Sequence, residues 1–251
     1  MPKKISLAFY EFGLLYHQDV GIDRDLVDEL IKRSRCQFEL SNLPRAQIWN
    51  ELSSGQLMMS VSAIKTPERE VFSLFSAPYL RLKNMAVMQK HIADQNPDAA
   101  RFLANSNLRW GVVKSYKHGA EQDELIEKLR AQERVIEAKD SAELFQMLSE
   151  NKIQGLFAQA TAYNFYARQL SFDKPLVARD WAPVDRGVEA RLVYSKKHFS
   201  EADMAAWDQI IYQMQADGTI QKIIARYLPT PEVKRTLIPT VDQLNQKKTA
   251  N

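Results

Sequence analysis

The stretch SAIKTPEREVFSLFSAPY, residues 62–79, carries the clearest structural and functional signals in the chain. Within it, Thr66 can serve as a helix N-cap, and Pro67 stands at the first helical position, where a missing N–H costs nothing. Arg69 then falls in the first turn, beside backbone N–H groups that lack a helical partner. A guanidinium at the positive end of a helix predicts a receptor for a carboxylate or phosphate. The alternative is an ordinary surface helix in which Arg69 pairs with an acidic neighbour.

Size and composition indicate a globular protein. The 251 residues suit one large domain or two lobes, and 45% of them are hydrophobic and 26% charged. A formal net charge of only +3 argues against nucleic acid as a partner. The single cysteine, Cys36, excludes an intramolecular disulfide. No run reaches the ~20 apolar residues of a membrane span. The start, MPKKISLAFYEF, lacks the apolar stretch of a signal peptide, which leaves a cytoplasmic protein or a mature form with an added Met.

Strand-like and helix-like patterns alternate in two series, which predicts an α/β fold with parallel strand pairs. Ser141 is expected to cap one helix, and Ser200 with Asp203 has the spacing of a capping box for another. Residues 91–106 are polar and poorly patterned, and the prolines after Tyr227 mark an irregular tail. The predicted strands cover residues 4–10, 38–40, 57–63, 85–89, 108–113, 135–138, 153–158, 176–181 and 188–194.

Motifs for metal, nucleotide or covalent chemistry are not evident in the sequence. The four histidines form neither an HExxH motif nor a His/Cys cluster, and the eight glycines form no phosphate-binding loop. We therefore expect no metal and no cofactor. Residues 62–65 match the SxxK pattern of serine acyl-enzymes, but no KTG or SDN triplet accompanies it. We assign no catalytic residue.

Blocks of sequence along most of the chain are similar to one known family. In the first half they are GIDRDLVDEL at 21–30, RAQIWNELSSGQL at 45–57, TPERE at 66–70 and FSAPY at 75–79. In the second half they are WGVVKSY at 110–116, EAKDSAELFQMLSENKIQGLFAQ at 137–159 and DQIIYQMQADGTIQKIIARYL at 208–228. In this order they resemble the type 2 periplasmic solute-binding proteins of ABC importers, in the amino-acid-type family (extracellular solute-binding protein family 3).

The resemblance implies a two-lobed periplasmic-binding-protein type 2 fold, with the ligand in a cleft between lobes joined by two hinge strands. Lobe 1 would comprise residues 1–88 and 190–251, lobe 2 residues 89–189, and the hinge strands residues 85–89 and 188–194. Ligand would select a closed form by touching both lobes. The resemblance further implies a periplasmic monomer that delivers a small solute to a membrane permease and binds no nucleic acid.

The resemblance also implies roles for individual residues. Arg69 matches the arginine that holds a ligand carboxylate, and Ser115 and Tyr116 match a turn of lobe 2 that meets the same carboxylate. Each aromatic side chain can equally be part of the core. The expected ligand-binding residues are Arg69, Arg45, Ser62, Ile64, Thr66, Tyr10, Glu11, Phe12, Ser115, Tyr116 and Gln159.

Two positions depart from the family pattern in a way that bears on the ligand. Arg45 stands where amino-acid binders often place an aromatic that stacks on the ligand. Gln159 stands where they place an aspartate that grips the α-ammonium group. Gaining a cation and losing an acid favours a dicarboxylate or another anionic solute. Alternatively, Arg45 is a surface cation at a helix start, although that position is electrostatically poor for a cation.

Three functions follow from these observations. The first is a solute-binding protein without catalysis, the second a sensing or signalling domain of the same fold. The third is an enzyme, such as a dehydratase of cyclic acids, which would need an acid or base in the cleft, with Glu11 as the candidate. The charged, hydrogen-bonding residues without a nucleophile–base pair favour the first, so we expect a protein that is not an enzyme.

Overall fold

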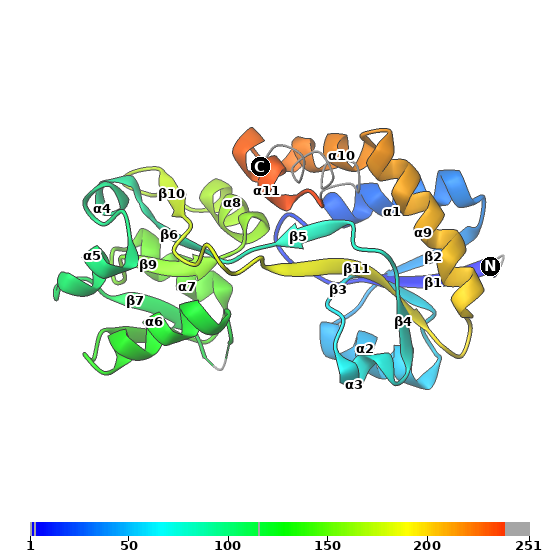
Figure 1. Ribbon diagram of the computed structural model, residues 1–251, viewed down its shortest axis with the longest axis horizontal. Helices are drawn as coiled ribbons and strands as arrows, with labels where there is room; N and C mark the ends of the chain where they lie inside the picture. The colour runs from blue at the N-terminus through cyan, green and yellow to red at the C-terminus, as the bar shows by residue number, and fades with distance from the viewer. Residues whose placement is uncertain (1, 3, 115, 239–251) are drawn as a thin grey trace, which may run out of the picture. The chain divides into compact units, whose positions relative to one another are not determined.

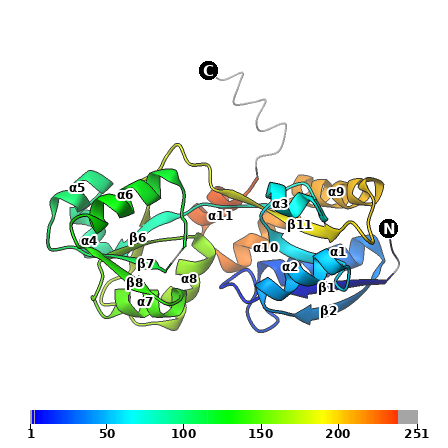
Figure 2. The same ribbon diagram turned by 90° about the horizontal axis from the view of Figure 1, so that it is seen from below.

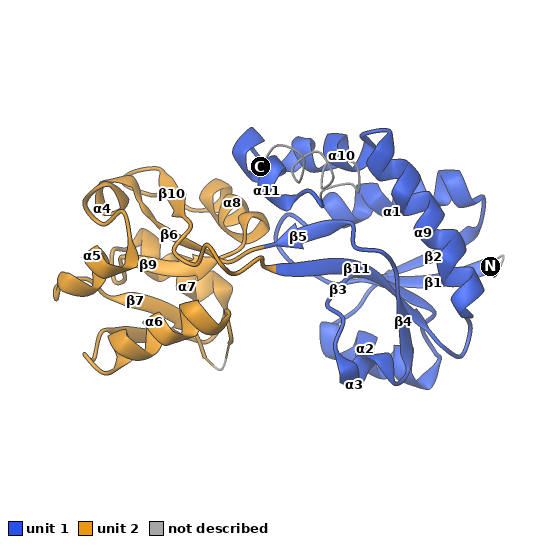
Figure 3. Ribbon diagram, viewed as in Figure 1, with its two compact units in different colours: residues 1–82, 188–251 blue, residues 83–187 orange. Residues whose placement is uncertain are grey.

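The chain of the computed structural model divides into two compact units, and residues 2, 4–114 and 116–238 are described. Unit 1 comprises residues 1–82 and 188–251, and unit 2 comprises residues 83–187 (Figure 3). Residues 85–88, expected in lobe 1, form most of β6 (Met85–Gln89), which pairs with two strands of unit 2. Because of these ladder hydrogen bonds, β6 belongs to unit 2, and the boundary between the two units lies between residues 82 and 83. The role of residues 85–89 and 188–194 as hinges stays a prediction.

Unit 1 is built on a six-stranded mixed sheet with the strand order β2-β1-β3-β11-β4, and β5 pairs with β11. Strand β1 runs parallel to β2 and β3, whereas β11 is antiparallel to its partners. Helices α1, α9 and α10 lie on one side of this sheet and α2 on the other (Figure 1). The elements are β1 (Lys4–Phe9), α1 (Ile22–Ser34), β2 (Gln37–Asn42), α2 (Arg45–Ser54), β3 (Met59–Ala63), α3 (Pro67–Glu70), β4 (Ser73–Phe75), β5 (Leu80–Leu82), β11 (Val188–Ser195), α9 (Glu201–Ala216), α10 (Thr219–Tyr227) and α11 (Thr230–Thr236).

Unit 2 has a five-stranded sheet with the order β10-β6-β9-β7-β8, in which β7 runs parallel to β8 and β9. Helices α5 and α6 cover one side and α7 and α8 the other (Figure 2). The elements are β6 (Met85–Gln89), α4 (Lys90–Gln95), α5 (Ala99–Ala104), β7 (Trp110–Val113), α6 (Ala120–Arg130), β8 (Val135–Ala138), α7 (Ser141–Ser149), β9 (Gly155–Ala158), α8 (Ala160–Gln169) and β10 (Leu176–Arg179). The two α/β sheets confirm the predicted fold class.

Several local predictions are wrong in detail. Residues 91–106, for which the sequence pattern predicts no element, contain most of α4 and all of α5. Helix α5 begins at Ala99 and is capped by Asp98, whose side chain accepts from the N–H of Arg101. Helix α11 lies within the end that was expected to be irregular, with a proline in its first turn. Asp140 rather than Ser141 caps α7. The capping box of Ser200 and Asp203 is confirmed. Helices of six or seven residues are too short to show a hydrophobic period.

Strand β3 ends in a bulge that shapes the rest of unit 1. Arg191 and Val193 of β11 oppose Ala63 and Ser60, so two steps on β11 match three on β3 and one residue of β3 is extra. Ser62 has φ 47°, a left-handed conformation that is rare for a residue with a side chain. The bulge therefore turns the chain at the point where β3 leads toward α3.

A buried polar network holds the bulge in place. The N–H of Ser62, which the bulge displaces from the ladder, donates to Tyr79 Oη at 2.6 Å. Tyr79 Oη donates in turn to Asp23 Oδ1 at 3.0 Å. Tyr79 and Asp23 are only 0% and 1% exposed. Burial raises the pKa of the Asp23 carboxyl from 3.8 to about 7, although the hydrogen bonds from Ser62 and Tyr79 act in the opposite direction.

Unit 2 contains a buried arginine that is bonded mainly to carbonyl groups. Arg134 is 5% exposed, and its Nε donates to the Leu108 carbonyl at 2.7 Å. Its two Nη atoms donate to the carbonyls of Leu103 and Phe102 at 2.8 and 2.9 Å. Phe102 and Leu103 lie in the last turn of α5, and the Phe102 carbonyl also accepts from the N–H of the C-cap residue Asn105. Arg134 thus caps α5 and ties it to the start of β7.

We expect Arg134→Met to lower the free energy of unfolding by about 2–4 kcal/mol, because it removes the arginine donors to the carbonyls of Leu103 and Leu108. Urea unfolding of both proteins measures the difference. Arg130→Met is the matched control, since Arg130 makes only partly exposed ion pairs and its loss should cost less than about 1 kcal/mol. Equal effects of the two substitutions would contradict the capping role.

Asp23 gives the stability of the protein a specific pH dependence. The folded protein holds the Asp23 proton more tightly than the unfolded chain does, so this group destabilises the fold increasingly as pH rises from about 4 to about 7. Asp23→Asn keeps an acceptor for Tyr79 but cannot ionise. We expect the free energy of unfolding of this variant, relative to that of the wild type, to increase by about 2–3 kcal/mol as the pH rises from 5 to 8. Urea unfolding at four pH values measures this gain. Asp28→Asn on the same helix is the control, and a gain independent of pH would refute the assignment.

Candidate anion-binding site

Arg69 is held by the loop between β3 and α3 and by a tryptophan of α2. Its Nη1 donates to the Ile64 carbonyl at 2.7 Å. Its guanidinium carbon lies 4.0 Å from the centre of the Trp49 ring, a cation–π contact. Thr66 stands at the N-cap position as predicted, but its hydroxyl makes no capping bond, and α3 is a single turn of four residues. The helix-dipole argument for Arg69 is therefore wrong, because so short a helix has little dipole.

Arg45 is the first residue of α2, where the free N–H groups of the helix make a cation unfavourable. Its guanidinium carbon lies 5.4 Å from the centre of the Tyr10 ring. Tyr10 Oη donates to the Ser62 carbonyl at 3.1 Å, so the bulge also positions this ring. The Ser62 hydroxyl is directed toward Tyr79 Oη at 3.2 Å, and Ser62 is 3% exposed. Ser62 thus acts on the arginines indirectly, because its carbonyl positions the Tyr10 ring beside Arg45 and its turn leads to the Ile64 carbonyl that binds Arg69.

The two guanidinium groups carry positive charge that nearby carboxylates do not neutralise. Over the described part of the chain, no carboxylate oxygen lies within 4.0 Å of Arg45 or Arg69. The neighbouring Lys65, by contrast, pairs with Glu70 at 2.7 Å. Burial and then the charge of Arg45 lower the pKa of Arg69, while Tyr10 and Glu68 act in the opposite direction. We call Arg45, Arg69, Tyr10 and Trp49 the arginine cluster; an anion there would relieve the repulsion within it.

The other expected residues of unit 1 have different surroundings. Glu11 Oε2 lies 2.7 Å from His17 Nδ1, and Glu11 Oε1 accepts from Asn42 Nδ2 at 3.1 Å. Its carboxylate is therefore engaged in the loop after β1. The Phe12 ring lies 6.1 Å from that of Tyr10, which brings Phe12 to the edge of the arginine cluster.

In unit 2, the expected residues follow adjacent parallel strands. Tyr116 follows β7 and is 46% exposed, with its ring 4.9 Å from that of His118. Gln159 follows β9 and is the N-cap residue of α8. Its Oε1 is buried and has no hydrogen-bond partner among the described atoms. Carboxyl ends of parallel strands are where α/β sheets bind ligands. Ser115 lies outside the described residues.

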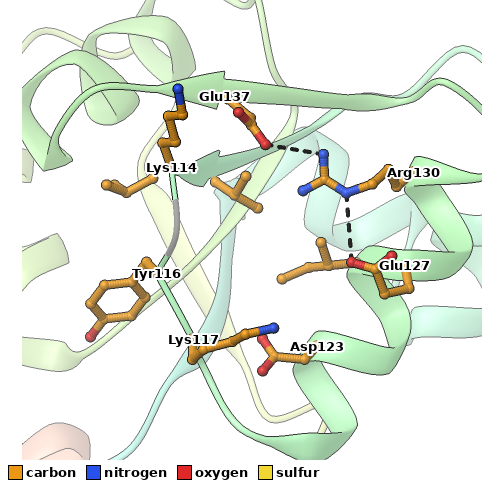
Figure 4. Close-up of a pocket in the computed structure, with 10 residues that line it drawn as sticks. Lys114, Tyr116, Lys117, Asp123, Glu127, Arg130 and Glu137 are labelled. Carbon is orange, nitrogen blue, oxygen red and sulfur yellow. Dashed lines mark hydrogen bonds and ion pairs between the residues drawn. The ribbon is translucent and has the colours of Figure 1, made fainter.

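A hollow of about 280 Å³ lies between α6 and the loop after β7 (Figure 4). Arg130 on α6 pairs with Glu137 at 3.1 Å and contacts Glu127 at 3.6 Å. Three basic and three acidic side chains line this hollow, so it does not share the net positive charge of the arginine cluster. Its lining residues are Val112, Val113, Lys114, Tyr116, Lys117, Asp123, Ile126, Glu127, Arg130 and Glu137.

Trp49 is the residue of the arginine cluster that sequence reasoning missed. The hydrophobic pattern of α2 places Trp49 on the same side as Ile48 and Leu52. That pattern explains why residue 49 is apolar, but it does not predict a contact with an arginine. Trp49 also stands four residues after Arg45, on the same face of the helix. The four-residue spacing between Arg45 and Trp49, together with the nearby Arg69, is the sequence signal that could have identified Trp49.

Among the described residues, no group of three or more His, Cys, Asp or Glu side chains could hold a metal ion. None of the helices within the described ranges is long and apolar enough to cross a membrane.

Solved structures with similar folds include substrate-binding domains and a solute-binding protein. Substrate-binding domain 2 of GlnP from Lactococcus lactis, in an open conformation, has a TM-score of 0.70 and 14% identity, over 90% of this chain and 96% of that one. The second substrate-binding domain of a putative amino acid ABC transporter from Streptococcus pneumoniae has a TM-score of 0.68 and 17% identity, over 90% and 100%. An ancestral cationic amino acid solute-binding protein has a TM-score of 0.70 and 16% identity, over 90% and 96%. These likenesses confirm the expected type 2 fold.

Sequence comparison supplies the family. None of the curated protein sequences matches the chain significantly. The model of one family does match, over residues 8–230, which is most of the chain. The chain therefore belongs to the bacterial extracellular solute-binding proteins, family 3.

Proposed function

We propose that this protein captures a small solute that carries one or more carboxylate or other anionic groups. The observation that carries this proposal is the arginine cluster, in which Arg45 and Arg69 lie against aromatic rings without a carboxylate partner among the described residues. A hydrogen bond from a charged group contributes about 1.5–3 kcal/mol. Micromolar binding needs about 8 kcal/mol, so two such contacts would supply a large share of it.

Gln159 supports a ligand that lacks an ammonium group. The resemblance places an aspartate at this position in amino-acid binders, and a neutral amide cannot offer the same charge to an ammonium group. A Streptococcus pneumoniae substrate-binding protein with 18% identity and a TM-score of 0.63 was solved bound to L-arginine. Amino acids are therefore the ligand class against which anionic solutes must be tested.

Delivery of the solute to the membrane permease of an ABC importer is the second part of the proposal. Family membership and the resemblance support this part. The same two observations support a periplasmic location and capture of the solute by closure of the two lobes. A sensing domain would bind the same solute but pass its conformation to a protein partner. Catalysis has little support, because Glu11, the acid that could act as a base, is engaged by His17 and Asn42.

We expect at least one anionic solute to raise the thermal stability of the wild type, in a panel of amino acids, dicarboxylates, sugar acids and phosphorylated solutes. A ligand at 100 times its Kd adds about 2.7 kcal/mol to the free energy of unfolding. Arg69→Ala should weaken binding about 10- to 100-fold, because it removes a charge-assisted contact. Differential scanning fluorimetry followed by calorimetric titration measures both effects.

The control for this substitution is Arg24→Ala, which removes an arginine of α1 that pairs with Asp28. It should leave ligand affinity unchanged. Stabilisation by zwitterionic amino acids alone would sink the anionic-ligand proposal. An unchanged response of Arg69→Ala would show that Arg69 is structural.

Arg45 is expected to set the preference for a second negative group. We expect Arg45→Gln to weaken binding of the best dicarboxylate about tenfold or more, and binding of its monoamide by much less. Calorimetric titration of the two ligands against both proteins gives the comparison. A similar loss for the dicarboxylate and the monoamide would mean that Arg45 does not contact the second carboxylate.

A further inference from the structure

The guanidinium of Arg69 is fixed by two contacts of different kinds. Its Nη1 donates to the Ile64 carbonyl at 2.7 Å, and its carbon Cζ lies over the Trp49 ring, 4.0 Å from the ring centre. The first contact uses one N–H group, whereas the cation–π contact does not require a hydrogen bond. Ile64 O is its only hydrogen-bond acceptor among the described residues, so further N–H groups of Arg69 are available to a ligand.

Trp49 is itself held firmly, by packing alone. It packs against the apolar cluster between α2 and the sheet, and the Phe72 ring meets it edge-on at 6.4 Å and 77°. Its Nε1 is buried and has no hydrogen-bond partner in the described structure. The contacts that position the Trp49 side chain among the described residues are therefore those of its ring.

The electrostatics of Arg69 explain what that contact provides. Arg69 is half-buried and close to Arg45, and both circumstances disfavour its charge. A carboxylate could stabilise the charge, but it would occupy the N–H groups that a ligand needs. The negative face of an indole attracts a cation without accepting its in-plane hydrogen bonds.

We propose that Trp49 acts as a positioning residue that takes the place of a counter-ion for Arg69. It stabilises the positive charge of the guanidinium and holds the group so that the N–H groups not used by Ile64 can bind an oxyanion through two hydrogen bonds. This inference rests on the proposed function, because it assigns the same site to an anionic ligand. It adds that affinity depends on an aromatic ring that need not touch the ligand.

The test compares Trp49→Leu, which removes the ring, with Trp49→Phe, which keeps an aromatic face but removes Nε1. Phe38→Leu is the matched control, because it removes a half-buried ring of unit 1 that contacts Trp207 rather than an arginine. Succinate is the probe in calorimetric titrations, and urea unfolding records the stability of each variant. NMR of the nitrogen-15-labelled protein gives the chemical shift of the Arg69 Nε–Hε group. The ring current of Trp49 changes this chemical shift, so the measurement reports on the contact between the two side chains.

We expect Trp49→Leu to weaken succinate binding about tenfold, with Trp49→Phe restoring most of the affinity and Phe38→Leu having no effect. On an Arg69→Met background, Trp49→Leu should cause no further loss. Equal affinity of Trp49→Leu and wild type, or a loss that persists on the Arg69→Met background, would overturn the proposal.

The NMR measurement separates this inference from the proposed function. If succinate fails to bind the wild type, the proposed ligand class loses support. The positioning role is then judged by the Arg69 resonance alone. A ring-current shift that is present in wild type, weaker in Trp49→Phe and absent in Trp49→Leu supports it. An Arg69 resonance that is the same in all three proteins overturns it.

Discussion

The backbone of Ser62, held at φ 47° by the side chain of Tyr79, is the constraint on which the arginine cluster depends. The bulge at this residue turns the chain out of β3, so that the Ile64 carbonyl meets Arg69 and the Ser62 carbonyl meets Tyr10. A left-handed conformation costs roughly 1–3 kcal/mol for a residue with a side chain. The buried bonds from Ser62 to Tyr79 and from Tyr79 to Asp23 offset that cost and satisfy the N–H that the bulge removes from the ladder.

Charge is distributed differently in the two units. Around the hollow of unit 2, acidic and basic side chains balance, and Arg130 is paired with two glutamates. In the arginine cluster of unit 1, aromatic rings take the place of acids. Stabilising a cation through a π face leaves its hydrogen-bonding groups available. An electrostatic cost that is retained in the folded protein is a common property of binding sites, because the ligand relieves it.

The sequence singled out Arg69, but it did not predict the contacts that Arg69 makes. Arg69 was identified from a supposed helix start and from the family resemblance. The helix proved to be one turn long, so the carbonyl of Ile64 and the ring of Trp49 replace the expected dipole. The partners of Ser62 could not be predicted either, because Tyr79 and Asp23 lie 17 and 39 positions away. Only the pairing of β3 with β11 brings the bulge into being.

The sequence by itself determined the alternation of strands and helices, the family, and the presence of arginine at positions 45 and 69. These features are encoded locally, in hydrophobic period and in the order of short motifs, and they survive without knowledge of any distant contact. Tertiary structure alone decided that both arginines lie on aromatic faces without a described carboxylate partner, and that Asp23 is buried beneath the bulge. Such features depend on which segments of the chain pack together. Contacts between residues far apart in the sequence cannot be predicted from any single segment.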